Sequence, residues 1–83
     1  MYTKDVVVGA RLNIYSQPEA VFIQKANAYK SSIWVEKGDR KANAKSLLGV
    51  LSLGLTSGQS IKISAEGDDE ELAVASLEEL ITE

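Results

Sequence analysis

Four segments of the chain carry the residue pattern of β-strands, with β-branched side chains, alternating apolar and polar positions, or both. These segments are residues 5–8, residues 32–36, a short stretch through Ala42 and Asn43, and residues 60–65. Ile33 and Val35 fall on the same face of an extended chain. A turn signal at residues 37–40 predicts that the second and third strands pair as a hairpin.

Three further segments repeat apolar residues at helical spacing. In the first helix, which should end near residue 28, the apolar positions are Val21, Phe22, Ala26 and Tyr29. In the short second helix they are Leu47, Leu48, Val50, Leu51 and Leu53. In the last helix they are Ala73, Val74, Leu77, Leu80 and Ile81. We therefore expect the order β-α-β-β-α-β-α in a single domain over residues 1–83. Three helices on one face of a four-stranded, mostly antiparallel sheet would give an α+β open-faced β-sandwich.

The starts of the first and last helices carry charged residues that need an explanation. Ser16 is a favourable N-cap, and Glu19 three residues later completes a Ser-x-x-Glu capping box, with Pro18 tolerated in the first turn. Because Glu19 already brings a carboxylate to this helix start, we expect a structural cap rather than a phosphate site. Residues 68–71 are acidic but lack the spacing of a calcium loop, so we expect them to stabilise the start of the last helix.

Apolar residues surround the second helix almost completely. A surface helix needs only one apolar stripe, so we expect some of its leucines to be exposed and to mark a surface that binds a partner. A helix buried on all sides would show the same pattern, and periodicity does not separate the two.

Ser46 stands at the start of this helix, next to Lys45. A phosphate group on Ser46 would be favoured by the helix dipole and would add about two negative charges beside the apolar residues. On local sequence alone, a plain N-cap serine is the favoured explanation of the same residue.

Composition excludes several classes of chemistry. The chain contains no histidine and no cysteine, so Ser-His-Asp triads, classical zinc sites and disulfides are absent. The net charge of −3 disfavours nucleic acid as a direct partner, and no apolar run approaches the roughly 18 residues of a membrane span. We therefore expect a protein that is not an enzyme and holds no cofactor or metal. The absence of cysteine favours a reducing compartment, the cytoplasm.

Several segments of the chain match the residue pattern of a known protein family. The segments that carry it are Lys25-Ala26-Asn27, Val35-Glu36-Lys37, Asn43-Ala44-Lys45-Ser46-Leu47-Leu48-Gly49-Val50-Leu51-Ser52-Leu53-Gly54 and Ala65-Glu66-Gly67. On these residues the chain resembles the HPr family, the small phosphocarrier proteins of the bacterial sugar phosphotransferase system. The similarity extends over essentially the whole chain, and it implies the open-faced β-sandwich expected above.

The resemblance also shows where the chain departs from the family pattern. In the family, the loop into the first helix reads roughly Gly-[Leu/Ile]-His-Ala-Arg-Pro, and its histidine accepts phosphate while its arginine helps to hold it. Here Tyr15 stands at the histidine position and Gln17 at the arginine position. A tyrosine hydroxyl has a pKa of about 10, so little nucleophilic phenolate exists at neutral pH. We therefore expect no ordinary phosphorelay.

The resemblance implies that the second family site is retained at Ser46. In HPr proteins of many Gram-positive bacteria the matching serine is phosphorylated by an ATP-dependent kinase, and that form acts in carbon catabolite repression with a transcription factor. The residues that match Leu47, Leu48 and Leu51 form the docking patch for such partners. A known variant, the catabolite repression HPr, also lacks the histidine and keeps the serine. This chain resembles that variant in both respects.

These features favour a regulatory protein that is switched at Ser46 and recognised through Leu47, Leu48 and Leu51. The expected partners are a serine kinase of the HPr kinase type and either a transcriptional regulator or another phosphotransferase-system protein, with no direct contact to nucleic acid or membrane. Two alternatives stay open on the sequence. One is a phosphocarrier with an atypical acceptor at Tyr15 or Ser16, and the other is a binding module that uses no phosphate.

Overall fold

The computed structural model of the protein describes residues 1–10 and 16–82. Its elements are β1 (Tyr2–Val7), α1 (Pro18–Ala26), β2 (Ser32–Lys37), β3 (Arg40–Asn43), α2 (Leu47–Leu53), β4 (Ser60–Glu66) and α3 (Glu70–Ile81). Their order is the predicted one. None of the helices in the described ranges is long and apolar enough to cross a membrane.

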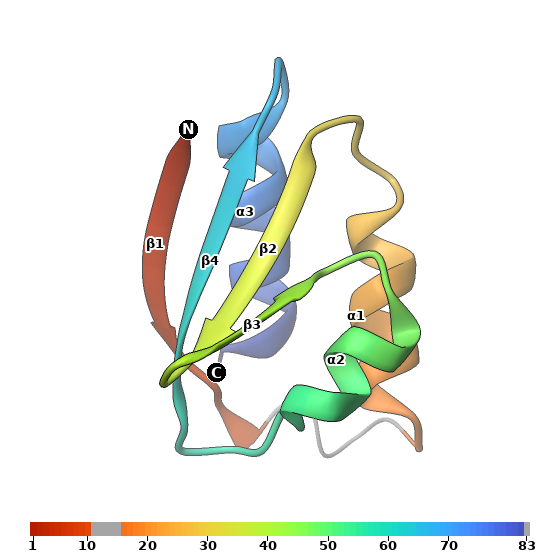
Figure 1. The fold of residues 1–83 in the computed structure, drawn as a ribbon, viewed down its shortest axis with the longest axis vertical. Helices are drawn as coiled ribbons and strands as arrows, with labels where there is room; N and C mark the ends of the chain where they lie inside the picture. The colour runs from red at the N-terminus through yellow and green to blue at the C-terminus, as the bar shows by residue number, and fades with distance from the viewer. Residues whose placement is uncertain (11–15, 83) are drawn as a thin grey trace.

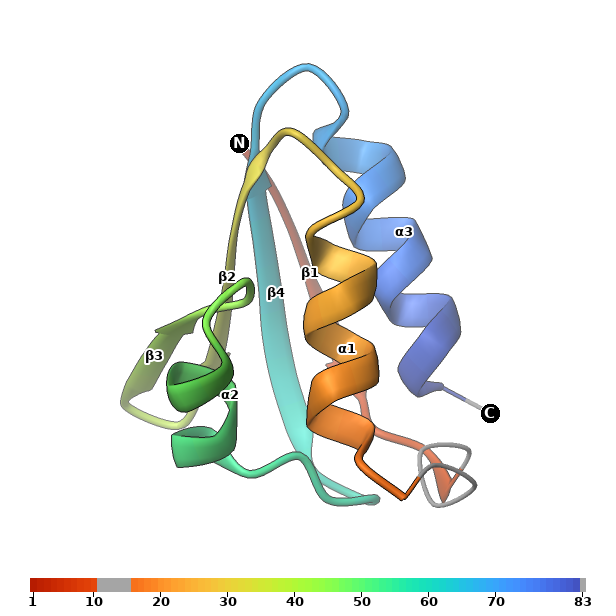
Figure 2. The same ribbon diagram turned by 90° about the vertical axis from the view of Figure 1, so that its right-hand side faces the viewer.

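The strands form one antiparallel sheet in the order β1-β4-β2-β3, with β1 and β3 at its edges (Figure 1). Figure 2 shows α1 and α3 side by side on the same face of this sheet. The shorter α2 lies beside the β3 edge, where it packs against β3 and α1. This arrangement confirms the predicted α+β open-faced β-sandwich.

The register of the strands brings apolar residues together on the face that the helices cover. Ile33 pairs with Ala65 and Val35 pairs with Ile63, and all four side chains are at most 1% exposed. From α3 the sheet is covered by Ala73, Val74, Leu77 and Ile81, which are buried, and by Leu80, which is partly buried. The apolar faces predicted for β2 and α3 are therefore confirmed.

The other face of the sheet is polar and carries alternating charges. Asp5, Lys62, Glu36 and Lys41 lie opposite one another on the four neighbouring strands. The Lys41 ammonium lies 5.3 Å from the centroid of the Trp34 ring and 3.9 Å from Oε1 of Glu36. Opposite charges on neighbouring strands favour this register.

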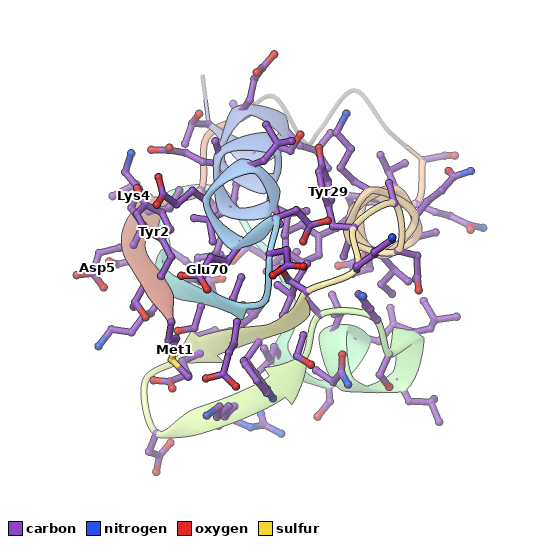
Figure 3. All side chains as sticks on the ribbon, turned by 90° about the horizontal axis from the view of Figure 1, so that it is seen from above. Met1, Tyr2, Lys4, Asp5, Tyr29 and Glu70 are labelled. Atoms are coloured by element: carbon purple, nitrogen blue, oxygen red, sulfur yellow. The ribbon has the colours of Figure 1, made fainter. Side chains whose placement is uncertain are left out.

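Side chains on the covered face of β1 hold this edge strand to α3. Figure 3 shows Tyr2 and Lys4 on the side of α3 and Asp5 turned outward. Tyr2 packs against the core, and Nζ of Lys4 donates a hydrogen bond of 2.8 Å to Oε1 of Glu78. That hydrogen bond raises the pKa of the Lys4 ammonium.

The start of α1 differs from the predicted capping box. The helix begins at Pro18 with Gln17 as its N-cap, so Ser16 lies one residue before the cap. The cause is local, because a residue that precedes proline is disfavoured in the helical conformation, and Gln17 is non-helical with φ −133° and ψ 77°. Pro18 thereby takes the first helical position, which suits its fixed φ. The Ser16 capping box is therefore wrong, whereas Glu19 does lie in the first turn as expected.

Candidate functional site

Ser46 is the N-cap of α2, as the sequence predicts. Its backbone is extended, with φ −104° and ψ 118°, and its Oγ accepts a hydrogen bond of 3.3 Å from the N–H of Gly49. The residue is half-buried, between the end of the β2–β3 hairpin and the first turn of α2. The serine hydroxyl therefore satisfies one of the free N–H groups at the helix start.

The helix α2 buries only part of its apolar surface. Val50 and Leu53 are in the core, whereas Leu47 is 48% exposed, Leu48 81% and Leu51 50%. We call these three exposed side chains the leucine patch. The prediction that α2 exposes leucines is confirmed, and the alternative of a helix buried on all sides is wrong.

Three basic side chains fix the position of α2. The ammonium of Lys45 donates a 2.7 Å hydrogen bond to the carbonyl of Tyr29, in the loop after α1. The ammonium of Lys37 donates a 2.8 Å hydrogen bond to the carbonyl of Leu53, in the last turn of α2, and Arg40 bonds to Ser52. Lys45 is a chain neighbour of Ser46, but its ammonium points to the loop after α1.

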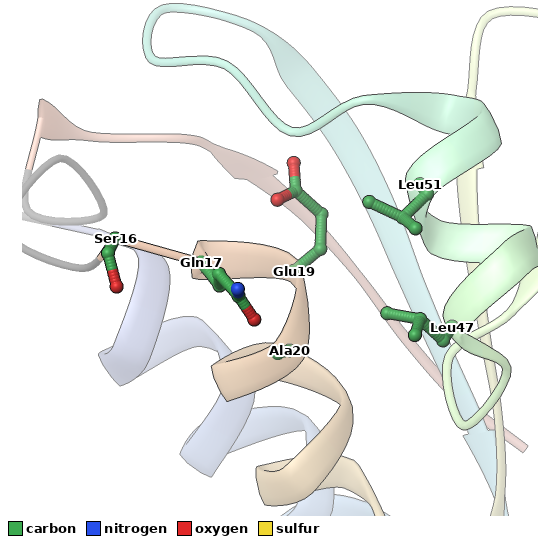
Figure 4. A pocket seen from close by; sticks show the side chains of 6 residues that line it. All are labelled: Ser16, Gln17, Glu19, Ala20, Leu47 and Leu51. Carbon is green, nitrogen blue, oxygen red and sulfur yellow. The ribbon is translucent and has the colours of Figure 1, made fainter.

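A pocket of about 330 Å³ lies between the first turn of α1 and the exposed side of α2 (Figure 4). Its described lining residues are Ser16, Gln17, Glu19, Ala20, Leu47 and Leu51. The structure thus brings Ser16 and Gln17, the described end of the loop into α1, next to two residues of the leucine patch. No local pattern in the sequence placed Glu19 and Ala20 in this pocket with Leu47.

The residues of the loop into α1 are described only in part. Tyr15, at the family's phosphohistidine position, and Arg11 lie outside the described residues. Ser16 and Gln17 are exposed at the mouth of the pocket, and Glu19 is half-buried. Among the described lining residues, Glu19 is the only one that carries a charge.

Two acidic residues at the start of α3 accept hydrogen bonds from backbone N–H groups. Asp69 accepts hydrogen bonds of 2.9 Å and 3.0 Å from the N–H groups of Lys30 and Ser31, and Oε1 of Glu70 accepts one of 3.2 Å from the N–H of Gly67. Glu70 and Glu71 lie in the first turn, as predicted for this run. Within residues 1–10 and 16–82, no group of three or more His, Cys, Asp or Glu side chains could hold a metal ion.

Comparisons with known proteins agree on one family. A family model described as "PTS HPr component phosphorylation site" matches residues 2–83. The HPr-like protein Crh of Halalkalibacterium halodurans is 40% identical over 77 residues, which cover 93% of this chain and 92% of that protein. The phosphocarrier protein HPr of Haemophilus influenzae is 43% identical over 81 residues, covering 98% and 95%. The solved structure of a phosphocarrier protein HPr from Bacillus anthracis has a TM-score of 0.90 at 34% identity, covering 98% of this chain and 96% of that one.

Proposed function

This chain belongs to the HPr family of the phosphotransferase system, whose members are phosphocarrier proteins and not enzymes, and we propose that it is a regulatory member phosphorylated at Ser46. Its similarity to the Crh-type relative supports a regulatory role. Its similarity to an HPr named as a phosphocarrier is of the same order. The choice between a regulatory protein and a phosphocarrier therefore depends on which functional residues this chain has.

The absence of histidine is the observation that carries this proposal. A phosphocarrier of this family passes phosphate through a histidine, and this chain has Tyr15 at that position and Gln17 in place of the arginine beside it. A tyrosine hydroxyl is mostly protonated at neutral pH, because its pKa is about 10. A phosphate ester on tyrosine is also much less prone to onward transfer than a phosphorus–nitrogen bond.

Ser46 is the proposed acceptor. Its hydroxyl lies at the start of α2, and the only hydrogen bond found for it among the described residues is the long one from Gly49. A phosphate group here would add a charge of about −1.5 to −2 immediately before Leu47, the first residue of the leucine patch. The change in charge would thus occur beside an exposed apolar surface.

The leucine patch is the proposed docking surface. Leu47, Leu48 and Leu51 project from a helix whose ends are anchored by Lys45 and Lys37, so the patch is presented on a fixed element. Contiguous exposed apolar residues of this kind mark protein-binding surfaces. The proposed partners are a serine kinase of the HPr kinase type and either a transcriptional regulator or another phosphotransferase-system protein.

Phosphorylation can be tested directly. We expect incubation with an HPr kinase and ATP to add one phosphate to the intact mass of the protein, and Ser46→Ala to abolish this addition. Ser57→Ala, at an exposed serine after α2, is the matched control and should be phosphorylated normally. No added phosphate, or a phosphate that persists in Ser46→Ala, would overturn the proposal.

A further inference from the structure

We propose that the polar face of the sheet, on the side away from α1 and α3, binds the same face of a second copy of the chain. We call this surface the open face. The two-fold axis would run parallel to the strands, between β4 and β2. The open face is separate from the leucine patch and carries no part of the Ser46 site, so this inference goes beyond the proposed function.

The open face presents side chains from all four strands. Figure 1 looks onto it, with α3 behind the sheet, and Figure 2 shows α1 and α3 together on the other side. Most of its side chains are exposed, whereas Trp34 and Glu36 are half-buried and Ser64 is buried. The residues are Thr3, Asp5 and Val7 of β1, Ser60, Lys62 and Ser64 of β4, Trp34 and Glu36 of β2, and Lys41 and Asn43 of β3.

The described chain on either side of residues 11–15 lies on the helix side of the sheet. The N–H of Gly9 donates a hydrogen bond of 2.7 Å to the carbonyl of Ile81, at the end of α3. Ser16 and Gln17 line the pocket between α1 and α2. The charge argument below therefore uses only described residues of the sheet.

The charges of the open face alternate across the sheet. One row of paired residues, read from the β1 edge to the β3 edge, consists of Asp5, Lys62, Glu36 and Lys41. A half-turn about an axis parallel to the strands reverses this order in the second copy, so that β1 faces β3 and β4 faces β2. Asp5 would then lie opposite the partner's Lys41. Lys62 would lie opposite the partner's Glu36, and every charge in the row would face one of opposite sign.

Other ways of stacking two open faces lose this match. A half-turn about an axis across the strands would place each strand over its own copy. Lys62 would then lie over the partner's Lys62, or over an uncharged residue if the rows are offset. A shift of one strand from the centred arrangement would place Asp5 over the partner's Glu36. Like charges in contact disfavour these arrangements, so the row selects one register.

The balance of charge favours a second copy over a strongly charged partner. The row holds two carboxylates and two ammonium groups, so it has no net charge to attract nucleic acid or a highly charged peptide. Glu36 and Lys41 lie 3.9 Å apart. Within residues 1–10 and 16–82, Asp5 and Lys62 form no ion pair. The second copy would supply one to each of them.

Trp34 provides the apolar centre of the proposed interface. It is half-buried and pairs with Ser64 of β4 in its own sheet. Because β2 would face β4 of the second copy, the indole ring would lie near the partner's Ser64, and a large side chain opposite a small one suits stacked sheets. Four short strands give a small interface, so we expect a weak dimer with a Kd of about 0.1–1 mM.

Sedimentation equilibrium of the unmodified protein, at concentrations below and above this Kd, measures the association. We expect a monomer–dimer equilibrium that weakens as salt is raised. The emission of Trp34, the only tryptophan of the chain, should shift to shorter wavelength as the dimer forms, because its ring loses contact with water. Changes in amide chemical shifts with concentration should be concentrated in the four strands.

Two charge variants and their mixture test the register. Lys62→Glu places a carboxylate opposite the partner's Glu36, and Glu36→Lys places an ammonium opposite the partner's Lys62. Each variant alone should dimerise at least about tenfold more weakly than the parent. An equimolar mixture should form a heterodimer within about threefold of the parent affinity, because every charge in the row again faces one of opposite sign. A variant that simply failed to fold would not be rescued in this way.

Lys25→Glu in α1 and Glu71→Lys in α3 are the matched controls. They make the same changes in net charge at exposed residues outside the open face, and should leave the dimer affinity within about twofold. The proposal is overturned by a protein that stays monomeric at about 2 mM, by a dimer that Lys62→Glu and Glu36→Lys leave intact, or by a mixture as weak as each variant alone. These measurements use unphosphorylated protein, so their outcome is independent of the test at Ser46.

Discussion

The carboxylate of Asp69 accepts a 3.0 Å hydrogen bond from the backbone N–H of Ser31 and a second hydrogen bond from the Ser31 hydroxyl. It also accepts one of 2.9 Å from the N–H of Lys30. These bonds join the loop between α1 and β2 to the start of α3, and Ser31 is only 1% exposed. The hydrogen bond from the Ser31 hydroxyl is the main cause that lowers the pKa of Asp69 from its ordinary value of 3.8.

The Asp69 contacts predict a specific loss of stability in acid. Because the folded pKa lies below the unfolded one, the carboxylate stabilises the fold above the unfolded pKa, and this contribution is lost as the pH falls through the folded pKa. Asp69→Asn should therefore be less stable than the parent at neutral pH, and the difference should shrink between about pH 5 and about pH 2.

Urea unfolding across this pH range measures the effect. Asp39→Asn, in the exposed turn after β2, is the matched control and should leave the acid dependence of the parent unchanged. A difference between Asp69→Asn and the parent that stays constant with pH would contradict the role of the carboxylate charge.

Gly67 is predicted to tolerate no side chain, because it lies against the same loop. A Cβ atom at Gly67 would lie 2.6 Å from Oγ and 2.8 Å from Cα of Ser31, and its φ of 152° is unfavourable for other residues. Gly67→Ala should lower the unfolding free energy by about 1–3 kcal/mol. Gly38→Ala, at a turn with a φ of 63° and open space around it, should cost only about 1 kcal/mol. Equal losses in the two variants would show that the contact with Ser31 adds nothing.

Ser46 should contribute to stability even without phosphate. Replacing an N-cap serine by alanine costs about 0.5–2 kcal/mol, and the 3.3 Å bond to Gly49 places Ser46→Ala in the lower half of that range. Ser46→Asp keeps an oxygen acceptor at the helix start and should unfold close to the parent. Denaturant unfolding followed by the fluorescence of Trp34 provides the measurement. If Ser46→Asp loses as much as Ser46→Ala, the capping role is wrong.

The protein should not take part in the ordinary phosphorelay. With no histidine in the chain, incubation with phosphoenolpyruvate and the general phosphotransferase enzyme should leave its intact mass unchanged. An HPr that contains the family histidine is the positive control. An acid-labile phosphate, or a stable adduct at Tyr15 or Ser16, would instead support the atypical phosphocarrier.

The local pattern of the chain was sufficient for the order of elements and for most of the core. The spacing of Ile33 and Val35 predicted the buried face of β2, and the excess of leucines in α2 predicted its exposed patch. The start of α1 was also within reach of the sequence, since the restriction that Pro18 places on Gln17 is a nearest-neighbour effect. The Ser-x-x-Glu pattern instead indicates an N-cap at Ser16, one residue before the observed N-cap at Gln17.

By itself, the sequence determined that histidine and cysteine chemistry is absent, and it predicted that Ser46 lies at the start of α2. The exposure of Leu47, Leu48 and Leu51 depends on how that helix packs. Only the tertiary structure decided that Asp69 binds the loop at Ser31, that Lys45 reaches Tyr29, and that Glu19 shares a pocket with Leu47. The physical reason is how far apart the interacting residues lie along the chain. Capping and periodicity act between residues a few positions apart, whereas these contacts join separate elements and form only when α1, α2 and α3 pack around the sheet.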